Sequence, residues 1–434
     1  MQNEITPIGI TNWRNNRIPF GIRDKDRLGH IYVVGKTGVG KSTLLANMAI
    51  SDIQKGKGVA VIDPHGDIAQ NLLDYIPKHR IKDVIYFNPA DIEYPIAFNP
   101  LHAIHPDHHH LVASGMVSTF KKIWSESWGP RLEHMLRFTI LALLEYPHAT
   151  LLDIQPMLTD ACTRKTILEY VKNSNTRAFW YNEFDKYTPA FRAEAISPIV
   201  NKVGLFASCM PLRNIVGQQT KGFRMSQVLD EKKILIVNLS KGLIGEDACT
   251  FIGSMLVTSI QLATMYRAKH EEHTRIPFYL YVDEAHSFIS LSFADMLSEA
   301  RKYGLSLFLA HQYIEQMHEK IRSAIFGNVG TMITFRVGST DAEVLAKEFQ
   351  PVFNESDMVN LPKYAMYIKL MIDGATSKPF SANTIAVDTE KTFLRKDVLH
   401  FSQKGYGKNR EDVEREISLR HKHVDSEIGQ ERLF

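Results

Sequence analysis

The sequence predicts an α/β fold with a mostly parallel sheet and an all-α domain inserted between two groups of its strands. Short apolar runs bounded by turn residues alternate with helix-length segments, a pattern typical of parallel strands covered by helices. From about residue 108 to 224 this pattern stops, and apolar residues recur at helical spacing instead. The core domain is therefore expected to be discontinuous in the sequence.

The strand-like runs set the predicted domain boundaries. Three of them precede the helical block, at 31–34, 59–63 and 84–87. Four more follow it, at 234–238, 278–282, 306–310 and 331–335. We therefore expect a core of residues 1–107 and 225–388, an inserted all-α domain at 108–224, and a charged tail at 389–434 that is helical or partly disordered.

The composition indicates a folded protein with a large core. Of the 434 residues, 44% are hydrophobic and 23% are charged, which excludes a wholly disordered or fibrous chain. The net charge of +3 is too small to indicate a nucleic-acid partner without a local basic patch. Cys162, Cys209 and Cys249 have neither disulfide-framework nor metal-site spacing, so we expect buried thiols in a reducing compartment.

We expect no signal peptide and no transmembrane segment. The beginning of the chain lacks a basic stretch followed by an apolar one. The most apolar helical stretch, 251–266, is shorter than the roughly 20 residues that cross a bilayer. The expected location is the cytoplasm, with peripheral attachment to the inner membrane through partners as the alternative.

A glycine-rich loop follows the first strand-like run. Residues 35–42 read GKTGVGKS and match the GxxxxGK[ST] pattern, with the strand before and the helix after that the pattern requires. Its glycines let backbone N–H groups converge on phosphate oxygens. We expect ATP and Mg²⁺ as ligands, with Lys41 at the β- and γ-phosphates and Ser42 at the metal. The predicted nucleotide-binding residues are Gly35, Lys36, Thr37, Gly38, Val39, Gly40, Lys41, Ser42 and Thr43.

Polar residues that end other strands complete the predicted site. Asp283 and Glu284 follow the run at 278–282; Asp283 is expected to hold Mg²⁺, and Glu284 to polarise the attacking water. An acidic turn that caps the next helix is the alternative. Gln312 is predicted to sense the γ-phosphate, with a polar strand-end turn as its alternative. Asp63 points to the same sheet edge and is a candidate for contact with the nucleotide or its water shell.

Taken together, these segments resemble a known family. GKTGVGKS, VIDPHGD, YVDEAH, EARKYGLSLFLAHQ and NVGTMITFRVG are similar to segments of the type IV coupling proteins of conjugative DNA transfer (TraG/TraD-like), within the HerA/FtsK superfamily. The resemblance covers about residues 20–385. It implies a RecA-like P-loop ATPase core and a hexamer that moves DNA through a central channel. It also implies that Arg301 is an arginine finger for the neighbouring subunit and that Gln312 is the sensor.

Two other features bear on these roles. By itself Arg301 fits a solvated cation at a helix end, and Arg336, which also ends a strand, is the second candidate for the finger. Residues 160–224 contain ten Lys or Arg against five Asp or Glu. The aromatic residues interleaved with them suit single-stranded nucleic acid, with helical core packing as the alternative: Trp180, Tyr181, Phe184, Tyr187 and Phe191.

We interpret the chain as an ATPase that translocates DNA by hydrolysing Mg-ATP at subunit interfaces of a ring. A relaxase, a secretion channel or a nuclease is the expected protein partner. One alternative is a HerA-like helicase that works with a nuclease in DNA repair or defence. Another is a P-loop ATPase that remodels protein partners without DNA. DNA-stimulated turnover separates the two DNA motors from the third function.

Overall fold

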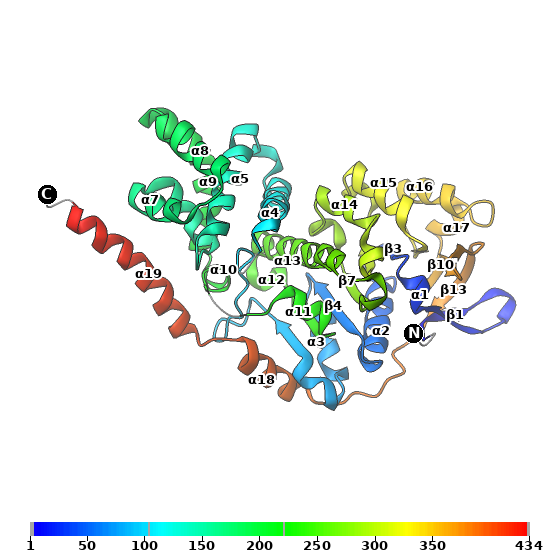
Figure 1. The fold of residues 1–434 in the computed structure, drawn as a ribbon. Coiled ribbons are helices and arrows are strands. Elements are labelled where there is room, and N and C mark those ends of the chain that lie inside the picture. The colour runs from blue at the N-terminus through cyan, green and yellow to red at the C-terminus, as the bar shows by residue number, and fades with distance from the viewer. Residues whose placement is uncertain (1–3, 103–104, 220–221, 432–434) are drawn as a thin grey trace. The chain divides into compact units, whose positions relative to one another are not determined.

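The computed structural model describes the backbone of residues 4–102, 105–219 and 222–431, which divides into two compact units (Figure 1). Unit 1 comprises residues 1–87, 224–242 and 263–402. Unit 2 comprises residues 88–223, 243–262 and 403–434. The compact units therefore differ from the predicted domains at 88–107, at 243–262 and in the tail.

An eleven-stranded sheet forms the centre of unit 1. Its seven parallel strands include all those predicted, so the mostly parallel α/β fold is confirmed. Four antiparallel strands extend one side, and β11 (Met371–Ile372) and β12 (Ala375–Thr376) form a separate pair. The order in the large sheet is β2 (Pro19–Arg23), β1 (Ile5–Thr11), β13 (Phe380–Thr384), β10 (Ala365–Lys369), β9 (Thr331–Thr334), β3 (Ile31–Val34), β8 (Leu305–His311), β7 (Phe278–Val282), β4 (Gly58–Asp63), β6 (Ile234–Asn238) and β5 (Val84–Phe87).

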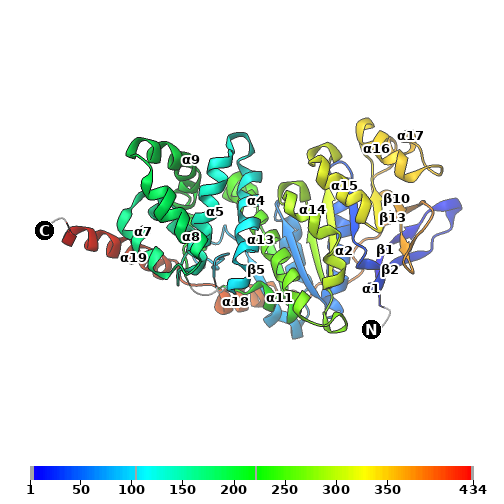
Figure 2. The ribbon, with the colours of Figure 1, turned by 45° about the horizontal axis from the view of Figure 1, so that its top comes forward.

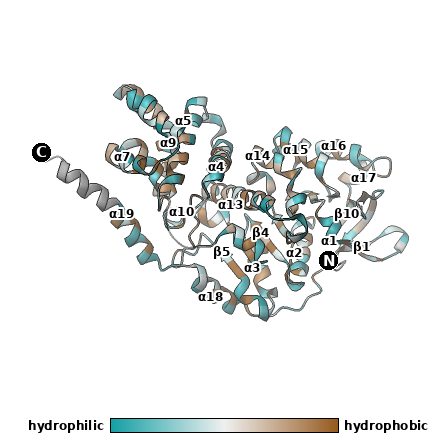
Figure 3. Cartoon of the chain, viewed as in Figure 1, coloured by the Kyte–Doolittle hydropathy of each residue, from teal (hydrophilic) through white to brown (hydrophobic). Residues whose placement is uncertain are grey.

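The four antiparallel strands were not predicted, because their sequences lack the residue pattern that is typical of a strand. Pro7 and Gly9 interrupt β1 at a register shift, and β13 reads Phe-Ser-Ala-Asn-Thr. Proline and glycine are residues that sequence patterns assign to turns or bulges. The parallel strands are buried on both faces and therefore read as continuous apolar runs. Figure 3 shows this hydrophobic character on β4 and β5.

Helices cover both faces of the parallel strands. Ile31 and Val33 of β3 belong to the same core as Leu45 of α2 (Lys41–Gln54). Tyr32 points to the other face, where its ring lies 5.8 Å from that of Phe326 in α15 (Glu319–Asn328). The helices α14 (Leu291–Leu297) and α15 lie beside the sheet in both Figure 1 and Figure 2. α3 (Asp67–Leu72) packs with α2 and β4.

A buried ion pair joins the N-terminal strands of unit 1 to the helix after the glycine-rich loop. Arg27, in α1 (Asp24–Arg27), donates to Asp52 of α2 at 2.6 Å, and the two side chains are 1% and 0% exposed. Tyr281 of β7 donates its hydroxyl to Asp52 at 2.5 Å and accepts from Arg27 at 2.7 Å. Burial alone would raise the pKa of Asp52, but Arg27 and Lys57 hold that pKa below its usual value.

Unit 2 is built from helices, as predicted for the insertion. The rings of Phe120 in α4 and Phe206 in α9 lie 6.0 Å apart between centroids, so these two helices pack through aromatic residues. The principal helices are α4 (His109–Ile123), α5 (Pro130–Glu145), α6 (Ile154–Thr159), α7 (Ala161–Tyr170), α8 (Ser174–Ala178), α9 (Pro189–Ser208), α10 (Met210–Val216), the 246–262 part of α13 (Glu246–Tyr266), and α19 (Arg410–Glu431).

Two segments join unit 2 that were predicted to lie elsewhere. The ring of Phe251 in α13 lies 4.6 Å from that of Phe206, and the Thr258 hydroxyl lies 3.0 Å from that of Thr119. The 246–262 part of α13 therefore belongs to the helical core of unit 2. In the tail, α18 (Arg395–Tyr406) precedes α19, whose Val413 is fully buried. The described tail is helical at Arg395–Tyr406 and Arg410–Glu431.

The helix at 246–269 is longer than the apolar stretch predicted from the sequence. Its 24 residues are long and apolar enough to cross a membrane, but 78% of its most apolar window is buried within the structure, as in a core helix. α9 and α10 pass the same test only as a pair, bent by 96°. Neither is more than weak evidence of a membrane span. Of the cysteines, Cys249 is buried as predicted, whereas Cys162 and Cys209 are only half-buried.

Removing one partner of the buried ion pair should destabilise unit 1 strongly. Arg27→Ala leaves the Asp52 carboxylate buried without its guanidinium, which costs roughly 3–5 kcal/mol of the free energy of unfolding. Urea titration followed by circular dichroism measures this loss. Lys25→Ala is the matched control, because Lys25 and Asp373 pair at 2.6 Å with both side chains more than half exposed. Equal destabilisation by both variants would contradict the role assigned to burial.

Candidate nucleotide site

The glycine-rich loop lies where β3 ends and α2 begins, as the sequence predicts. Gly38 and Gly40 have φ angles of 74° and 127°, a region that residues with a side chain enter only with strain. The loop is tied to neighbouring strands by hydrogen bonds from Gly35 N to His311 O (3.3 Å) and from Lys36 N to Arg336 O (2.9 Å). This strand–loop–helix geometry directs backbone N–H groups toward an anion.

Lys41 folds back over this loop. Its Nζ donates to the carbonyl oxygens of Gly35 (2.5 Å) and Lys36 (3.0 Å), and the side chain is buried. Burial lowers the pKa of Lys41, although Glu284 and Asp283 act in the opposite direction. The loop thus holds a cation of its own where phosphate oxygens are expected.

The carboxylates of Asp283 and Glu284 lie at the same sheet edge. β7 pairs in parallel with β8, and β8 pairs in parallel with β3, so β7 ends at the same edge of the sheet as the loop. Both side chains are buried. Burial, together with the neighbouring Glu284 and Asp63, raises the pKa of Asp283 to about 7. Crowded, buried carboxylates of this kind are stabilised by a bound cation.

Glu284 has a strained backbone and an unsatisfied carboxylate oxygen. Its φ of 47° and ψ of 51° are left-handed, which is uncommon for a residue other than glycine. Oε2 has no hydrogen-bond partner among the described residues, and His286 Nδ1 lies 3.6 Å away. Backbone strain of this sort costs about 1–3 kcal/mol and concentrates at functional sites.

Gln312 links Glu284 to the loop. Its Nε2 donates to Glu284 Oε1 at 2.6 Å, and its Oε1 accepts from the Thr37 hydroxyl at 3.0 Å. Gln312 therefore lies in the site, as predicted, between a loop residue and a carboxylate. The contribution of Thr37 through its side chain was missed, because the loop pattern leaves that position unspecified.

Asp63 has a local structural role. Its two carboxylate oxygens accept hydrogen bonds from His65 N (2.8 Å) and Ala69 N (3.0 Å) and thereby shape the turn into α3. It acts on the site through its charge, which raises the pKa of Asp283. Contact of Asp63 with a nucleotide remains a hypothesis.

The two candidate arginine fingers lie at opposite ends of the strands. Arg336 follows β9 at the edge of the loop, where its carbonyl accepts from Lys36. Arg301 is exposed and precedes β8, so the seven residues of that strand, about 20 Å, separate it from Gln312. Arg301 therefore cannot reach the nucleotide site of its own chain.

Tyr364 is a further residue at the loop that the sequence did not indicate. Its N–H donates to Val39 O at 2.8 Å, its φ is 67°, and its side chain is exposed. Only the fold places it there, since no motif surrounds it. In unit 2, by contrast, the predicted stacking residues Trp180 and Phe184 are fully buried, so helical core packing is correct for both.

No group of three or more His, Cys, Asp or Glu that could hold a metal ion is present among the residues that the structure describes. The metal ligands predicted from the sequence are a hydroxyl and a carboxylate. Asp283 lies buried at the site, and Ser42 is exposed on the first turn of α2. Such oxygen ligands suit Mg²⁺, which keeps several waters.

The fold and this site define a P-loop nucleotide-binding protein with a helical insertion. The family of type IV secretion-system coupling protein DNA-binding domains matches residues 15–365, and the chain belongs to that family. The family predicted from the sequence is confirmed. A search of curated protein sequences finds no match.

Several solved structures share this fold. The unbound monoclinic form of the bacterial conjugative coupling protein TrwBdeltaN70 has a TM-score of 0.62 at 15% identity, over 90% of this chain and 89% of its own. TrwB in complex with ADP and Mg²⁺ has a TM-score of 0.62 at 15% identity, over 91% and 92%. VirB4 of Thermoanaerobacter pseudethanolicus has a TM-score of 0.58 at 13% identity, over 92% and 99%.

Gly40→Ala should abolish the phosphate-binding geometry of the loop. A Cβ at this position would lie 3.1 Å from both Phe335 and Tyr364, in a backbone conformation that costs roughly 1–2 kcal/mol for an L-residue. Affinity for a fluorescent ATP analogue, measured by anisotropy, should fall at least ~10-fold. Gly338→Ala is the matched control, since a Cβ there meets nothing within 4 Å. Unchanged binding by Gly40→Ala would show that the loop tolerates another geometry.

Proposed function

We propose that this protein is a DNA-translocating ATPase of the coupling-protein type that hydrolyses Mg-ATP at the subunit interfaces of a ring, a hexamer by family resemblance. One observation carries the proposal. A phosphate-binding loop, a buried lysine and a buried carboxylate pair meet at one edge of the sheet, with a glutamine between them. This set contains the groups that phosphoryl transfer to water requires.

The residues present fit Mg-ATP. Asp283 and Glu284 are two buried carboxyl groups beside one buried cation, Lys41, and a bound metal cation would balance their charge. Ser42 and Asp283 would hold Mg²⁺, which supplies charge neutralisation at the β- and γ-phosphates. The solved complexes of TrwB with ADP and Mg²⁺ and with a non-hydrolysable ATP analogue support this choice of ligand.

Glu284 and Gln312 act on the attacking water. Glu284 is the proposed general base, because its buried carboxylate has one oxygen free to accept a proton. Gln312 holds the other oxygen and so orients the carboxylate. Since Gln312 also accepts from Thr37, a change in the loop reaches Glu284 through two hydrogen bonds.

Arg301 is the proposed finger that acts on a neighbouring subunit. Its exposed position at the opposite end of β8 prevents it from serving its own site. A finger cation supplied by another subunit raises turnover by roughly 10³–10⁵-fold. Arg336 stays the second candidate, although it borders its own loop.

Turnover measured with and without DNA tests the proposed substrate. A DNA motor should hydrolyse ATP faster when DNA is present. An ATP turnover rate that is the same with and without DNA would favour the alternative in which the ATPase remodels protein partners. A nuclease that co-purifies with the protein would favour the HerA-like helicase. A co-purifying relaxase or secretion-channel component would favour the conjugative motor.

Glu284→Gln should retain ATP binding while turnover falls at least ~10²-fold, the scale of a lost general base. Binding by isothermal titration calorimetry and turnover by phosphate release measure the two effects separately. Lys41→Ala is the comparison, because it removes the cation at the phosphates and should abolish turnover. Loss of ATP binding by Glu284→Gln would instead assign Glu284 a structural role.

Arg301→Ala should bind ATP normally, hydrolyse it poorly, and regain turnover when mixed with Lys41→Ala. A mixed interface pairs an intact loop from the first variant with an intact Arg301 from the second, which neither variant contains alone. If Arg336→Ala mixed with Lys41→Ala regained turnover and Arg301→Ala did not, the finger would be Arg336. No rescue by either arginine variant, with rings still formed, would refute the shared site.

A further inference from the structure

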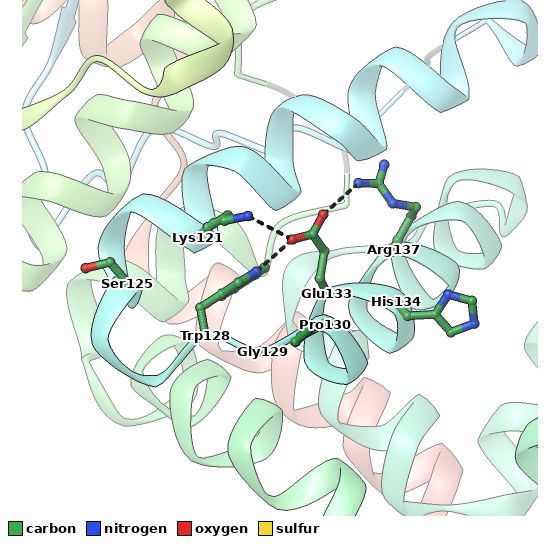
Figure 4. Close-up of a pocket in the computed structure, with 8 residues that line it drawn as sticks. All are labelled: Lys121, Ser125, Trp128, Gly129, Pro130, Glu133, His134 and Arg137. Atoms are coloured by element: carbon green, nitrogen blue, oxygen red, sulfur yellow. Dashed lines mark hydrogen bonds and ion pairs between the residues drawn. The ribbon is translucent and has the colours of Figure 1, made fainter. Parts of the chain in front are cut away.

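Unit 2 contains a pocket of about 500 Å³ near the end of α4 and the start of α5 (Figure 4). Its wall includes Lys121, Trp128, Glu133, His134 and Arg137. This volume falls within the range of small-ligand sites in proteins. None of these residues takes part in the nucleotide site of unit 1.

One carboxylate organises the wall of this pocket. Glu133 Oε2 accepts from Trp128 Nε1 at 2.9 Å and from Lys121 Nζ at 3.3 Å, and Glu133 Oε1 accepts from Arg137 at 3.3 Å. Figure 4 shows the three donors around Glu133. The hydrogen bond from Trp128, together with Lys121 and Arg137, keeps the pKa of Glu133 below its usual value. Glu133 is therefore charged at neutral pH and fixes the indole beside two cations.

The cations of the wall are not fully neutralised. Lys121 and Arg137 provide two positive charges against the one negative charge of Glu133. The side chains of Lys121 and Arg137 are 51% and 34% exposed, so a ligand from solvent can reach both. An anionic group at the mouth of the pocket would compete with Glu133 for them.

We propose that this pocket binds one nucleotide unit of a single DNA strand, with its phosphate at Lys121 and Arg137 and its base against Trp128. Cations beside an aromatic ring are the combination by which proteins hold single strands, through phosphate contacts and base stacking. An acidic peptide would use the cations but gives no role to the indole. The proposal rests on the proposed DNA motor and locates a DNA contact within unit 2.

Salt-dependent binding of a fluorescent oligothymidylate by the full chain tests the phosphate contacts. Lys121→Gln/Arg137→Gln removes two of them, and each contributes about 0.7 to the slope of log affinity against log salt for single strands, so the slope should become shallower by about 1.4. Lys165→Gln/Lys172→Gln is the matched control, because both lysines are exposed in unit 2 outside the pocket. The control should keep the wild-type slope within about 0.3.

Two further variants test the pocket in opposite directions. Trp128→Ala should weaken binding about 5- to 150-fold, the range for one lost stacking contact. Glu133→Gln removes the competing carboxylate and should tighten binding and steepen the salt slope. A residue that only supports the fold would not give tighter binding on substitution, so this result remains informative if the double variant misfolds. A strand containing 5-iodouracil should crosslink to Trp128 on irradiation.

The outcomes separate the pocket from the motor. DNA-stimulated turnover by the wild type, with equal strand binding by every pocket variant, would overturn the pocket and leave the motor standing. A wild type that binds no DNA would overturn both. Deoxythymidine monophosphate should displace the strand only at far higher concentration, and tighter binding of the monophosphate would overturn the assignment to a strand. The assignment would also be overturned if polyglutamate binding depended on Lys121 and Arg137 and strand binding did not.

Discussion

The parallel register of β3, β8 and β7 is the constraint on which the nucleotide site depends. Val34 pairs with His311, and Val282 pairs with Leu309, so the three chains leave the sheet at one edge. The glycine-rich loop follows β3, Gln312 follows β8, and the carboxylates of Asp283 and Glu284 follow β7. A shift of one residue would send alternate side chains to the opposite face and break the bonds from Gln312 to Glu284 and Thr37. Thr37 and Gln312, which are 275 positions apart in the sequence, thus meet only because of a short stretch of backbone pairing.

The buried ion pair of Arg27 and Asp52 connects α2 with β7, one of the strands in this register. Asp52 lies one helix length beyond the loop in α2, and Tyr281 lies two residues before Asp283 in β7. Both bond to one another and to Arg27, so the loop helix and the carboxylate strand share one rigid support away from solvent. Positioning of catalytic groups within fractions of an ångström requires such support, since small displacements cost large factors in rate.

The two polar sites of the chain differ in how they handle charge. At the nucleotide site the carboxylates are buried and incompletely satisfied, and Glu284 adopts a strained backbone. That arrangement is costly without a ligand, as is common where a protein is built to bind a charged group. In unit 2, Glu133 accepts hydrogen bonds from three donors at a solvent-accessible wall. Its carboxylate therefore has no unsatisfied oxygen. A ligand there would exchange one partner for another, which favours reversible contacts.

By itself, the sequence determined the features that short-range patterns encode. Seven buried strands were readable because parallel strands are apolar throughout, and GKTGVGKS and Asp283–Glu284 because phosphate and metal chemistry need those residues at strand ends. Only the tertiary structure decided that α13 completes unit 2, that Arg301 lies a strand length from Gln312, and that Thr37 bonds to Gln312. The pocket around Glu133 belongs to this second group. A polar side chain can face many partners at equal cost in the unfolded chain, and only the packing of distant elements selects which one it meets.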